Sequence, residues 1–339
     1  MLVSIIIKTL NEQDTIGLAV ESALAALVAY DGEVIVVDSL STDRTPEIAA
    51  AYPVTVLQLV REEDRSCGVG GELGYRQSRG KYVYMLDGDM ELQSEFLESA
   101  IAYLETNENC AGVGGKVVER NLVGLEYISR ERRRPEDASS NSVKSLPGGG
   151  LYRRQAIDQI GYFTNPNLHS YEELELGSRL RSHGWVLARL GMISVFHRSS
   201  TIGAYRLLGR KWRGHYFEGS GELLRSALGR RHLVSVLREA NVYAISAGLA
   251  TWVLLGLVVV GVLFGASRWA ALGVGLLWLL APIALMSLKK RSVKLGIYSM
   301  VTWSMGLVGL VRGFFRNSAI PTAAIASREL PKRTRENGH

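Results

Sequence analysis

Two carboxylates that flank a glycine, Asp87 and Asp89, directly follow the apolar run 82–86. A carboxylate pair on a tight turn at the end of a buried strand directs oxygen atoms into the space beyond it, and Gly88 lets the backbone bend freely. Mg²⁺ binds one or two carboxylates together with substrate phosphates, and Mn²⁺ accepts similar ligands. The turn therefore predicts a site for Mg²⁺ or Mn²⁺ that neutralises a diphosphate. The alternative is a solvated turn, because Asp-Gly is a common turn dipeptide.

Four apolar runs are predicted to be the strands that position this turn. They cover residues 3–7, 33–38, 54–60 and 81–86, and helical patterns alternate with them. Strands that alternate with helices and are apolar nearly throughout indicate an α/β fold with a parallel sheet covered on both faces. In such sheets, ligands bind beyond the carboxyl ends of the strands. Six polar residues fall at those ends, namely Thr9, Asn11, Glu12, Asp38, Asp87 and Asp89.

The composition changes along the 339 residues of the chain, which carry a net charge of +6. Residues 1–200 have the character of a soluble α/β domain. Residues 201–240 contain eight Lys and Arg against three Glu, residues 241–315 are largely apolar, and residues 316–339 form a basic tail. We therefore expect one large domain followed by a membrane-associated region.

Two segments in the apolar region are predicted to cross a membrane. Residues 242–266 and 269–288 carry no charged side chain, and a helix needs about 20 apolar residues to span a bilayer core. Only Ser267 and Arg268 join them, so a helical hairpin in a soluble core is disfavoured. A third segment, residues 295–311, is shorter and more polar, and either spans the membrane or lies at its surface.

The predicted orientation places the N-terminal domain on the cytoplasmic face of the cell membrane. The N-terminus lacks the basic segment of a signal peptide, and two cysteines, Cys67 and Cys110, fit a reducing compartment. Two crossings then return the basic loop 289–294 to the cytoplasm, as the positive-inside rule requires. A third crossing would move the basic tail outside, which favours a re-entrant or interfacial third segment.

Residues 201–240 interleave aromatic with basic side chains. This pattern also occurs in RNA-binding segments, but here it directly precedes the apolar helices. Such segments lie in the headgroup layer of a bilayer, so we expect interfacial helices that contact membrane lipids and no nucleic acid. They would hold the predicted ligand-binding site close to the membrane, which suggests that one of its ligands is lipid-linked.

Five segments, taken in order, resemble glycosyltransferase family 2, whose members have the GT-A fold. The resemblance covers about residues 1–200, and its segments are KTLNE (8–12), VVDSLSTDRT (36–45), GELGYRQSRGKYVYMLDGD (71–89), GGGLYRRQAIDQIGYF (148–163) and EELELGSRLRSHGW (172–185). It implies an inverting transfer from a nucleotide-diphosphate sugar, with a UDP-sugar as the first candidate. It also implies that Thr9, Asn11, Glu12 and Asp38 hold the nucleoside, that Asp87 lies near the ribose or the metal, and that Asp89 binds the metal.

The same resemblance assigns Glu173 to the position of the family's catalytic Asp. An inverting transfer needs a base that takes a proton from the acceptor hydroxyl. A carboxylate is stabilised as the anion at a helix N-terminus, so we expect Glu173 to be ionised. Because Glu is longer than Asp by one methylene, either the reach differs or Glu172 shares the role. The alternative is an amphipathic helix with solvated acids, whose apolar stripe contains Leu176 and Leu180.

Three further residues are predicted at the site. His197 ends the apolar run 192–196 and is either structural or the third metal ligand. Gly149 lies in a glycine triplet that is either a flexible turn or a close approach of the backbone to the donor sugar. Arg65 is predicted to supply a positive charge that the family often has near the position of Gly71 and Glu72.

Three departures from the family narrow the expected activity. The chain has Asp38-Ser39 where the family commonly has two acids, and Leu208–Trp212 replaces the Gln-x-x-Arg-Trp of processive synthases. The residues after Asp89 only partly match enzymes that glycosylate polyprenyl phosphate. We therefore expect the transfer of a single sugar to a lipid-linked or glycolipid acceptor in cell-surface glycan biosynthesis. The alternatives are a polyprenyl-phosphate glycosyltransferase, a small polysaccharide synthase, or a non-catalytic nucleotide-sugar-binding membrane protein.

The charged stretch 130–135 is predicted to be a solvated loop or a lid on the acceptor side.

Overall fold

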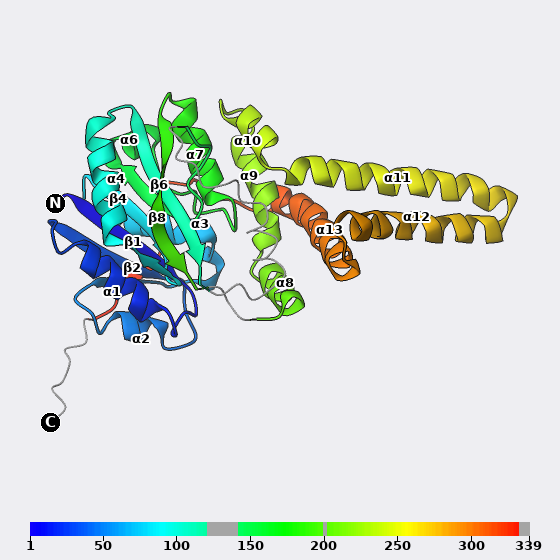
Figure 1. Cartoon of the computed structure of the whole chain (residues 1–339). Helices are drawn as coiled ribbons and strands as arrows, with labels where there is room; N and C mark the ends of the chain where they lie inside the picture. Colours follow the sequence, from blue (N-terminus) through cyan, green and yellow to red (C-terminus); the bar gives the residue numbers. More distant parts are fainter. Residues whose placement is uncertain (121–141, 199–201, 332–339) are drawn as a thin grey trace.

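The computed structural model describes residues 1–120, 142–198 and 202–331. An α/β unit carries a layer of short helices on one side, and a long helical hairpin projects beyond that layer (Figure 1). The predicted loop 130–135 lies outside the described residues.

Nine strands form one sheet in the order β5-β8-β6-β7-β4-β1-β2-β3-β9. The strands are β1 (Val3–Thr9), β2 (Gly32–Asp38), β3 (Thr55–Leu59), β4 (Tyr82–Asp87), β5 (Met90–Leu92), β6 (Cys110–Glu119), β7 (Gly150–Arg153), β8 (Val186–His197) and β9 (Ser327–Glu329). The four strands expected from the apolar runs are neighbours, and all three of their pairings are parallel. The predicted parallel sheet is therefore confirmed at its centre. The strands β5, β7 and β9 join antiparallel, so the whole sheet is mixed.

Helices cover both faces of the sheet. They are α1 (Ile16–Ala26), α2 (Thr45–Ala49), α3 (Cys67–Gln77), α4 (Ser94–Thr106), α6 (Arg154–Ile160) and α7 (Glu172–Ser182), with the short η1 (Glu62–Asp64). Alternate residues of β1 point to opposite faces, as a pleated strand requires. Ile5 and Ile7 belong to the core beneath α1 and α4, whereas Ile6 belongs to the core beneath α3 and α7. This packing explains why the central strands are apolar nearly throughout.

The basic stretch forms a layer of short helices between the sheet domain and the hairpin. These are α8 (Ala204–Arg213), η2 (Tyr216–Glu218), α9 (Gly219–Ala227) and α10 (Leu233–Glu239). A third apolar core joins the sheet domain to this layer through Leu168, which packs against a group on α9 and α10 that includes Leu223 and Val236. The layer therefore has a fixed position next to the loop that precedes α7.

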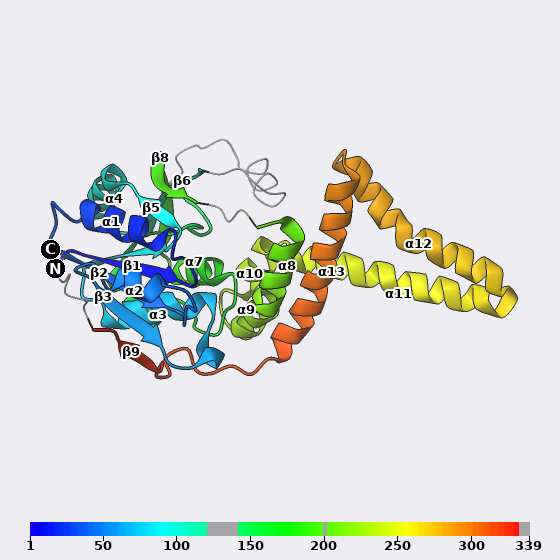
Figure 2. The ribbon, with the colours of Figure 1, turned by 90° about the horizontal axis from the view of Figure 1, so that it is seen from below.

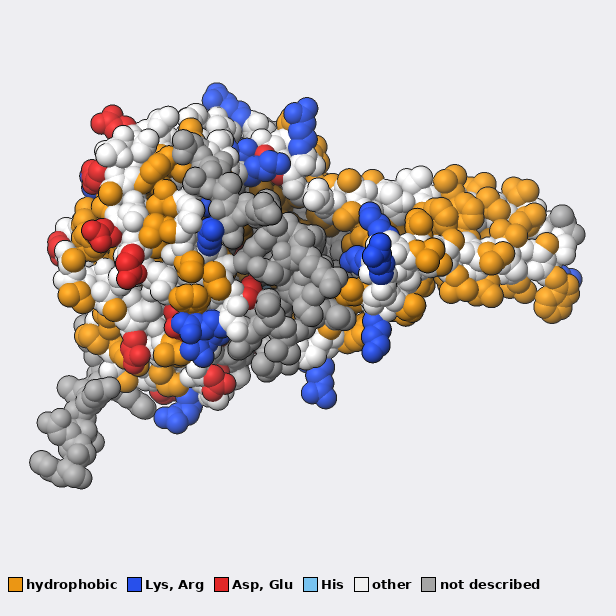
Figure 3. Space-filling model, viewed as in Figure 1, with side chains coloured by type: hydrophobic (Ala, Val, Ile, Leu, Met, Phe, Trp, Pro, Cys, Tyr) orange, Lys and Arg blue, Asp and Glu red, His pale blue; other side chains and the backbone are white. Residues whose placement is uncertain are grey.

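Three helices are long and apolar enough to cross a membrane, by length and composition: α11 (Val242–Ala266), α12 (Arg268–Lys289) and α13 (Val293–Phe315). The helices α11 and α12 pack against each other in the outer part of the hairpin and diverge towards its base (Figure 2), and the rings of Trp252 and Trp278 stack with centroids 4.4 Å apart. Hydrophobic side chains cover the visible face of this hairpin, and Lys and Arg side chains gather around its base (Figure 3).

The third helix, α13, crosses the base of the hairpin and packs on the short-helix layer (Figure 2). Gly309 and Gly313 make this contact possible. A Cβ atom would lie 2.4 Å from the carbonyl oxygen of Phe217 at the first position and 1.9 Å from that of Glu218 at the second. The glycines therefore allow the backbone of α13 to touch that of η2.

After α13 the chain returns to the sheet domain, and we call residues 317–330 the C-terminal segment (Figure 2). Ala319 exchanges hydrogen bonds with the side chain of Asn167, and the guanidinium of Arg76 donates to the carbonyl oxygens of Pro321 and Ala323. The segment then adds β9 to the edge strand β3. Part of the expected basic tail 316–339 thus lies against the sheet domain.

Candidate active site

A cavity of about 1990 Å³ opens between the carboxyl ends of the strands and the short-helix layer. Ligands of open α/β sheets bind at this position, beyond the carboxyl ends of the strands. Of the predicted site residues, the following line it: Thr9, Asn11, Glu12, Arg65, Asp87, Asp89, Glu172, Glu173 and His197. Asp38 and Gly149 are not among its lining residues, although their neighbours Ser39 and Gly148 are.

Lys8, the residue before Thr9 on β1, lies between two acids of this cavity. Its Nζ atom is 3.1 Å from Oδ1 of Asp87 and 3.0 Å from Oε1 of Glu172. Burial works against the charge of Lys8, but these carboxylates outweigh it and raise its pKa well above the ordinary value. Lys8 therefore stays charged and joins the two acidic groups of the site.

The glycine of the Asp87-Gly88-Asp89 turn is required by its neighbour Glu12. A Cβ atom on Gly88 would lie 2.2 Å from Oε2 of Glu12, which also accepts a 2.8 Å hydrogen bond from the hydroxyl of Thr9. Burial and the nearby Asp89 raise the pKa of Glu12 well above its usual value. The turn thus brings a third acid against the Asp pair.

Asp89 and His197 face each other because β5 pairs with the end of β8. Oδ2 of Asp89 is 3.0 Å from Nε2 of His197, and Nδ1 of His197 is 2.6 Å from Oε2 of Glu119. Burial disfavours the charged imidazole, but hydrogen bonds with these two carboxylates raise the pKa of His197 to about 10.

This pair fits a divalent cation by its donor set and spacing. Two neighbouring ligands at about 2.1 Å from an octahedral ion lie about 3.0 Å apart, and a carboxylate behind the imidazole is the usual support for a metal-binding His. However, the described residues contain no ready-made group of three or more His, Cys, Asp and Glu for a metal. The expected set of Asp87, Asp89 and His197 is not assembled, because Asp87 is paired with Lys8.

Glu172 and Glu173 are the first two residues of α7, as the sequence predicts. The backbone N–H of Gly148 donates to Oε1 of Glu173 at 3.1 Å. Burial, with the nearby Glu172, nevertheless raises the pKa of Glu173 to about 8. The expectation that the helix N-terminus keeps Glu173 ionised is therefore wrong, since desolvation outweighs the helix dipole. A pKa near neutrality suits a group that takes up a proton during catalysis.

The alternative of an amphipathic helix is also partly correct. Leu176 and Leu180 are fully buried, and Glu175 forms a buried ion pair with Arg179 at 2.7 Å. The later residues of α7 therefore pack into the core, and only its first turn lines the cavity.

The loop after β2 is built on Asp38, which has no exposed surface. Oδ2 of Asp38 accepts hydrogen bonds from the backbone N–H of Ser41 at 3.1 Å and from the side chain of Gln58 at 2.9 Å. The Ser41 hydroxyl accepts from the N–H of Asn11, and Oδ1 of Asn11 accepts from the N–H of Thr42. Asp38 thus lies behind the cavity wall, and Asn11 forms that wall.

Gly149 is held in a backbone conformation that suits glycine, with φ of +94°. A Cβ atom there would lie 2.1 Å from the carbonyl oxygen of Met85 on β4. The glycine triplet therefore allows a close approach to the central strand, and it is Gly148 that reaches the cavity.

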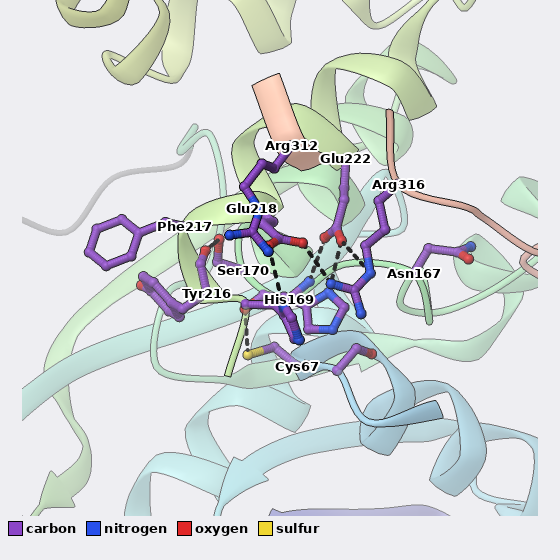
Figure 4. Close-up of polar contacts among 12 residues, drawn as sticks. Cys67, Asn167, His169, Ser170, Tyr216, Phe217, Glu218, Glu222, Arg312 and Arg316 are labelled. Atoms are coloured by element: carbon purple, nitrogen blue, oxygen red, sulfur yellow. Dashed lines mark hydrogen bonds and ion pairs between the residues drawn. The ribbon is translucent and has the colours of Figure 1, made fainter. Parts of the chain in front are cut away.

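A polar junction fixes the loop that leads into α7 (Figure 4). The N–H and Nδ1 of His169 both contact the carboxylate of Glu222 on α9, each at 2.9 Å. The Ser170 hydroxyl donates to the carbonyl oxygen of Tyr216, and Glu218 pairs with Arg316 beyond α13 at 2.6 Å. The short-helix layer therefore positions the first turn of α7.

The cavity wall that α8 forms is basic. Arg206, Arg210 and Arg213 lie on one face of α8 at i, i+4 and i+7, and all three line the cavity. No carboxylate among the described residues lies within ion-pair distance of these three guanidinium groups. The cavity thus has an acidic end at the sheet and a basic end at α8. Arg65 lies at its edge, paired with the exposed Glu62 at 2.8 Å.

Sequence reasoning missed Lys8, His169 and the support of Asp38 by Gln58. Lys8 had a local signal, since a lysine within a buried strand needs a partner. The other two had none, because their partners lie far away in the sequence.

Comparisons with known proteins point to a family and to a fold. Residues 4–161 match the family model described as Glycosyl transferase family 2. The succinoglycan biosynthesis protein ExoO of Rhizobium meliloti is 34% identical over 147 residues, which are 43% of this chain and 39% of that protein. The dolichol-phosphate mannosyltransferase of Pyrococcus furiosus is 28% identical over 36% of this chain and 35% of its own length. The chain thus spans well under half the length of these relatives.

Solved structures share the fold. The mannosyltransferase PcManGT from Pyrobaculum calidifontis, in complex with GDP-Man and Mn²⁺, aligns with a TM-score of 0.59 at 17% identity, covering 92% of this chain and 87% of that one. TarS 1-349 of S. aureus, in complex with UDP-GlcNAc, aligns with a TM-score of 0.50 at 16% identity, covering 92% and 91%. At these identities the likeness concerns the fold, and it confirms the expected GT-A architecture.

Proposed function

The chain carries a family 2 glycosyltransferase domain with apolar helices after it, and from this premise we propose that it transfers a hexosyl group from a nucleotide-diphosphate sugar to a lipid-linked acceptor. One observation carries the proposal. The Asp87-Gly88-Asp89 turn and the first turn of α7 line the same cavity, whose other wall is a basic helix next to the apolar helices.

In this proposal the donor occupies the sheet end of the cavity. Thr9, Asn11 and Glu12 contact the nucleoside, and Asp38 supports them from behind. Asp89 and His197 hold Mg²⁺ or Mn²⁺, with Asp87 near the ribose or the ion. When bound, the ion neutralises charge on the diphosphate as it leaves. PcManGT with GDP-Man and Mn²⁺ and TarS with UDP-GlcNAc support this class of donor.

Glu173 is the proposed base. It takes the proton of the acceptor hydroxyl while the hydroxyl oxygen forms a bond to the anomeric carbon, and the bond from that carbon to the diphosphate breaks. The nucleoside diphosphate leaves and the configuration inverts. Glu172 is held by Lys8 at 3.0 Å, which favours Glu173 over Glu172 for this role.

The acceptor is proposed to enter from the membrane. Arg206, Arg210 and Arg213 offer a phosphate-binding face, because guanidinium groups bind phosphate with charge-assisted hydrogen bonds. This face suits a sugar carried on a lipid diphosphate. It also favours the alternative acceptor, a polyprenyl phosphate, and the name of one relative, the dodecaprenyl-phosphate galacturonate synthase of Rhizobium johnstonii, supports that alternative.

We propose that α11 and α12 cross the membrane and that α13 lies on its surface. The C-terminal segment after α13 pairs with the catalytic sheet, so both ends of the apolar region are on the catalytic side. An even number of crossings follows. Counted at about 100° per residue around the helix axis, the exposed apolar residues of α13 lie within a sector of about 80°. They therefore form one apolar stripe, as an interfacial helix requires. They are Val293, Ile297, Val301, Val308, Val311 and Phe315. The positive-inside rule favours the cytoplasmic face for the catalytic domain.

The test is transfer and hydrolysis by the purified full-length protein in detergent. UDP-, GDP- and dTDP-sugars are screened with Mn²⁺ or Mg²⁺, with and without a membrane lipid extract, beside Asp89→Ala and Glu173→Gln. We expect metal-dependent release of one nucleoside diphosphate that lipid stimulates and that both variants lose. Metal-dependent nucleotide binding without turnover for any acceptor lipid would favour a non-catalytic binding protein.

A further inference from the structure

The C-terminal segment delivers a guanidinium group to the back of the proposed donor site. In the pairing of β9 with β3, Arg328 lies opposite Gln58. Nε and Nη2 of Arg328 donate to Oε1 of Gln58 at 3.1 and 2.5 Å, across a sequence separation of 270 residues. Both residues are thus held by the strand register and by a bifurcated contact between their side chains.

Gln58 is also hydrogen-bonded to Asp38. Its Nε2 atom donates to Oδ2 of Asp38 at 2.9 Å, and the same oxygen accepts from the N–H of Ser41. The Ser41 hydroxyl accepts from the N–H of Asn11 at 2.8 Å, and Asn11 lines the cavity. A continuous series of hydrogen bonds therefore joins the C-terminal segment to the cavity wall.

The chemistry of the amide makes Arg328 important in this series. The Gln58 amide can turn either its oxygen or its nitrogen towards Asp38, and only the nitrogen can donate to a carboxylate. A guanidinium has donors and no acceptor, so Arg328 binds the oxygen and leaves the nitrogen to Asp38. Asp38 depends on this donor because it is fully buried, and its Oδ1 atom has no hydrogen-bond partner among the described residues.

We propose that Arg328 is a positioning residue for the donor nucleotide, acting through Gln58 and Asp38 on the loop that holds Asn11. This inference rests on the proposed function, since it assumes that the nucleotide binds against that loop. It means that the segment after the last apolar helix sets the affinity of the donor site. The membrane anchor and the donor site are then coupled through one strand.

The segment has enough other attachments to make a point substitution informative. Arg76 holds the carbonyl oxygens of Pro321 and Ala323, and Asn167 holds Ala319. The N–H of Leu330 donates to the carbonyl oxygen of Val56. Loss of the Arg328 side chain therefore removes the first contact of the series, to Gln58, and leaves the segment in place.

The experiment compares Arg328→Ala, Arg328→Lys and the control Glu329→Ala in the full-length protein. Glu329 is the exposed neighbour on the same strand. The nucleoside diphosphate that the wild type binds is titrated by calorimetry, and the KM for the donor and kcat are measured separately. We expect Arg328→Ala to raise Kd and KM roughly tenfold, the effect of one charge-assisted hydrogen bond, and to change kcat less than about twofold. Arg328→Lys keeps a charged donor group and should recover most of the affinity.

A second comparison separates this role from a general effect on folding. If Arg328 acts through Gln58, the double variant Arg328→Ala with Gln58→Ala should bind nucleotide no more weakly than Gln58→Ala alone. Additive losses, or an Arg328→Ala variant that matches Glu329→Ala, would overturn the inference. A wild-type protein that binds no nucleoside diphosphate would overturn the proposed function and this inference together, whereas binding with an unchanged Arg328→Ala affinity overturns only the inference.

Discussion

At the scale of single residues, the charge of Lys8 sets the character of the site. Its ammonium lies between Asp87 and Glu172, and Glu12 and Glu173 line the same cavity. A buried cation among acids lowers their mutual repulsion, and removal of one partner of such a pair leaves the others uncompensated. Lys8 thus permits the acidic groups to be close together before any ligand binds.

Replacement of Lys8 by Met should therefore destabilise the protein and reduce activity. We expect a loss of about 1–3 kcal/mol in the free energy of unfolding, discounted for the partial exposure of Asp87. Denaturant unfolding of the full-length protein in detergent measures it. The control is Lys81→Met, which breaks the exposed Lys81–Glu105 pair and should cost less than about 1 kcal/mol. Equal losses in the two variants would contradict this account of Lys8.

The ionisation of Glu173 should lower the free energy of unfolding as the pH rises. Its pKa is about 8 in the folded chain and near 4.5 in an unfolded one, so the folded state holds a proton that the unfolded state releases between these values. The stability conferred by this proton is present at low pH and is lost as the pH rises towards 8. Glu173→Gln does not titrate, so its advantage in melting temperature over the wild type should grow from pH 5 to pH 8, reaching about 2–4 °C.

The same variant should lose activity, by about 10²-fold or more if Glu173 is the base. Thermal melts at several pH values and turnover measurements test the two effects independently. Glu98→Gln, at an exposed position of α4, is the control and should change neither. A pH-independent difference in melting temperature would mean that the Glu173 carboxyl does not titrate in this range.

At the scale of elements, turns and short helices decide which side chains reach the cavity. The residue before α7, Tyr171, has φ of +68°, and the junction of His169 with Glu222 holds the preceding loop. The glycine triplet that leads into β7 brings the N–H of Gly148 to Glu173. Both arrangements depend on backbone conformations that few residues adopt.

Gly149→Ala should therefore be far more harmful than the substitution of another left-handed glycine. Gly161→Ala is the matched control, because its φ is +89° and no atom lies within 4 Å of the added Cβ. We expect the control to cost about 1 kcal/mol and Gly149→Ala about 3 kcal/mol or more, since the carbonyl of Met85 lies in a central strand that cannot move away. Similar denaturant midpoints for the two variants would show that the backbone adjusts at Gly149.

The basic face of α8 should affect the acceptor and not the donor. Replacing Arg206 and Arg210 together by Gln should raise the KM for a lipid acceptor roughly tenfold or more, because each guanidinium contributes charge-assisted hydrogen bonds to phosphate. Donor hydrolysis without acceptor should stay unchanged. Arg231→Gln, an exposed residue outside the cavity, is the control. A matching rise in the donor KM would assign this face to the donor diphosphate instead.

At the scale of the whole molecule, the C-terminal segment constrains the membrane topology. It connects the end of α13 to β3, while α13 packs on the short-helix layer through Gly309 and Gly313. A third crossing would separate β9 from the sheet. In the proposed topology, the cavity, its basic wall and α13 face the bilayer together.

Labelling of single cysteines in sealed vesicles tests this topology. With Cys67 and Cys110 replaced by Ser, a membrane-impermeant maleimide should label Asn317→Cys on the same side as Glu98→Cys, which marks the catalytic domain. Arg268→Cys, between α11 and α12, should label only from the opposite side. Labelling of Asn317→Cys together with Arg268→Cys would mean that α13 crosses the membrane.

Local patterns were sufficient to predict the parallel centre of the sheet, the acids at its carboxyl edge and two long apolar helices. An apolar run bounded by turn residues indicates a buried strand, and this pattern can be recognised without knowing which segments it contacts. Thr9, Asn11, Asp87 and Asp89 follow such runs, so their presence at one edge could be expected. The position of Glu172 and Glu173 at the start of α7 was predicted instead from the resemblance to the family.

Other features depend on contacts between distant residues, which periodicity does not encode. The high pKa of Glu173 results first from its burial in the folded chain, and Asp87 is paired with Lys8, which lies on another strand. Asp38 is buried because Gln58 and Ser41 close over it, and β9 forms because the chain returns from α13 to the edge of the sheet. Desolvation and pairing depend on which segments meet in space, so these features could be known only from the folded chain.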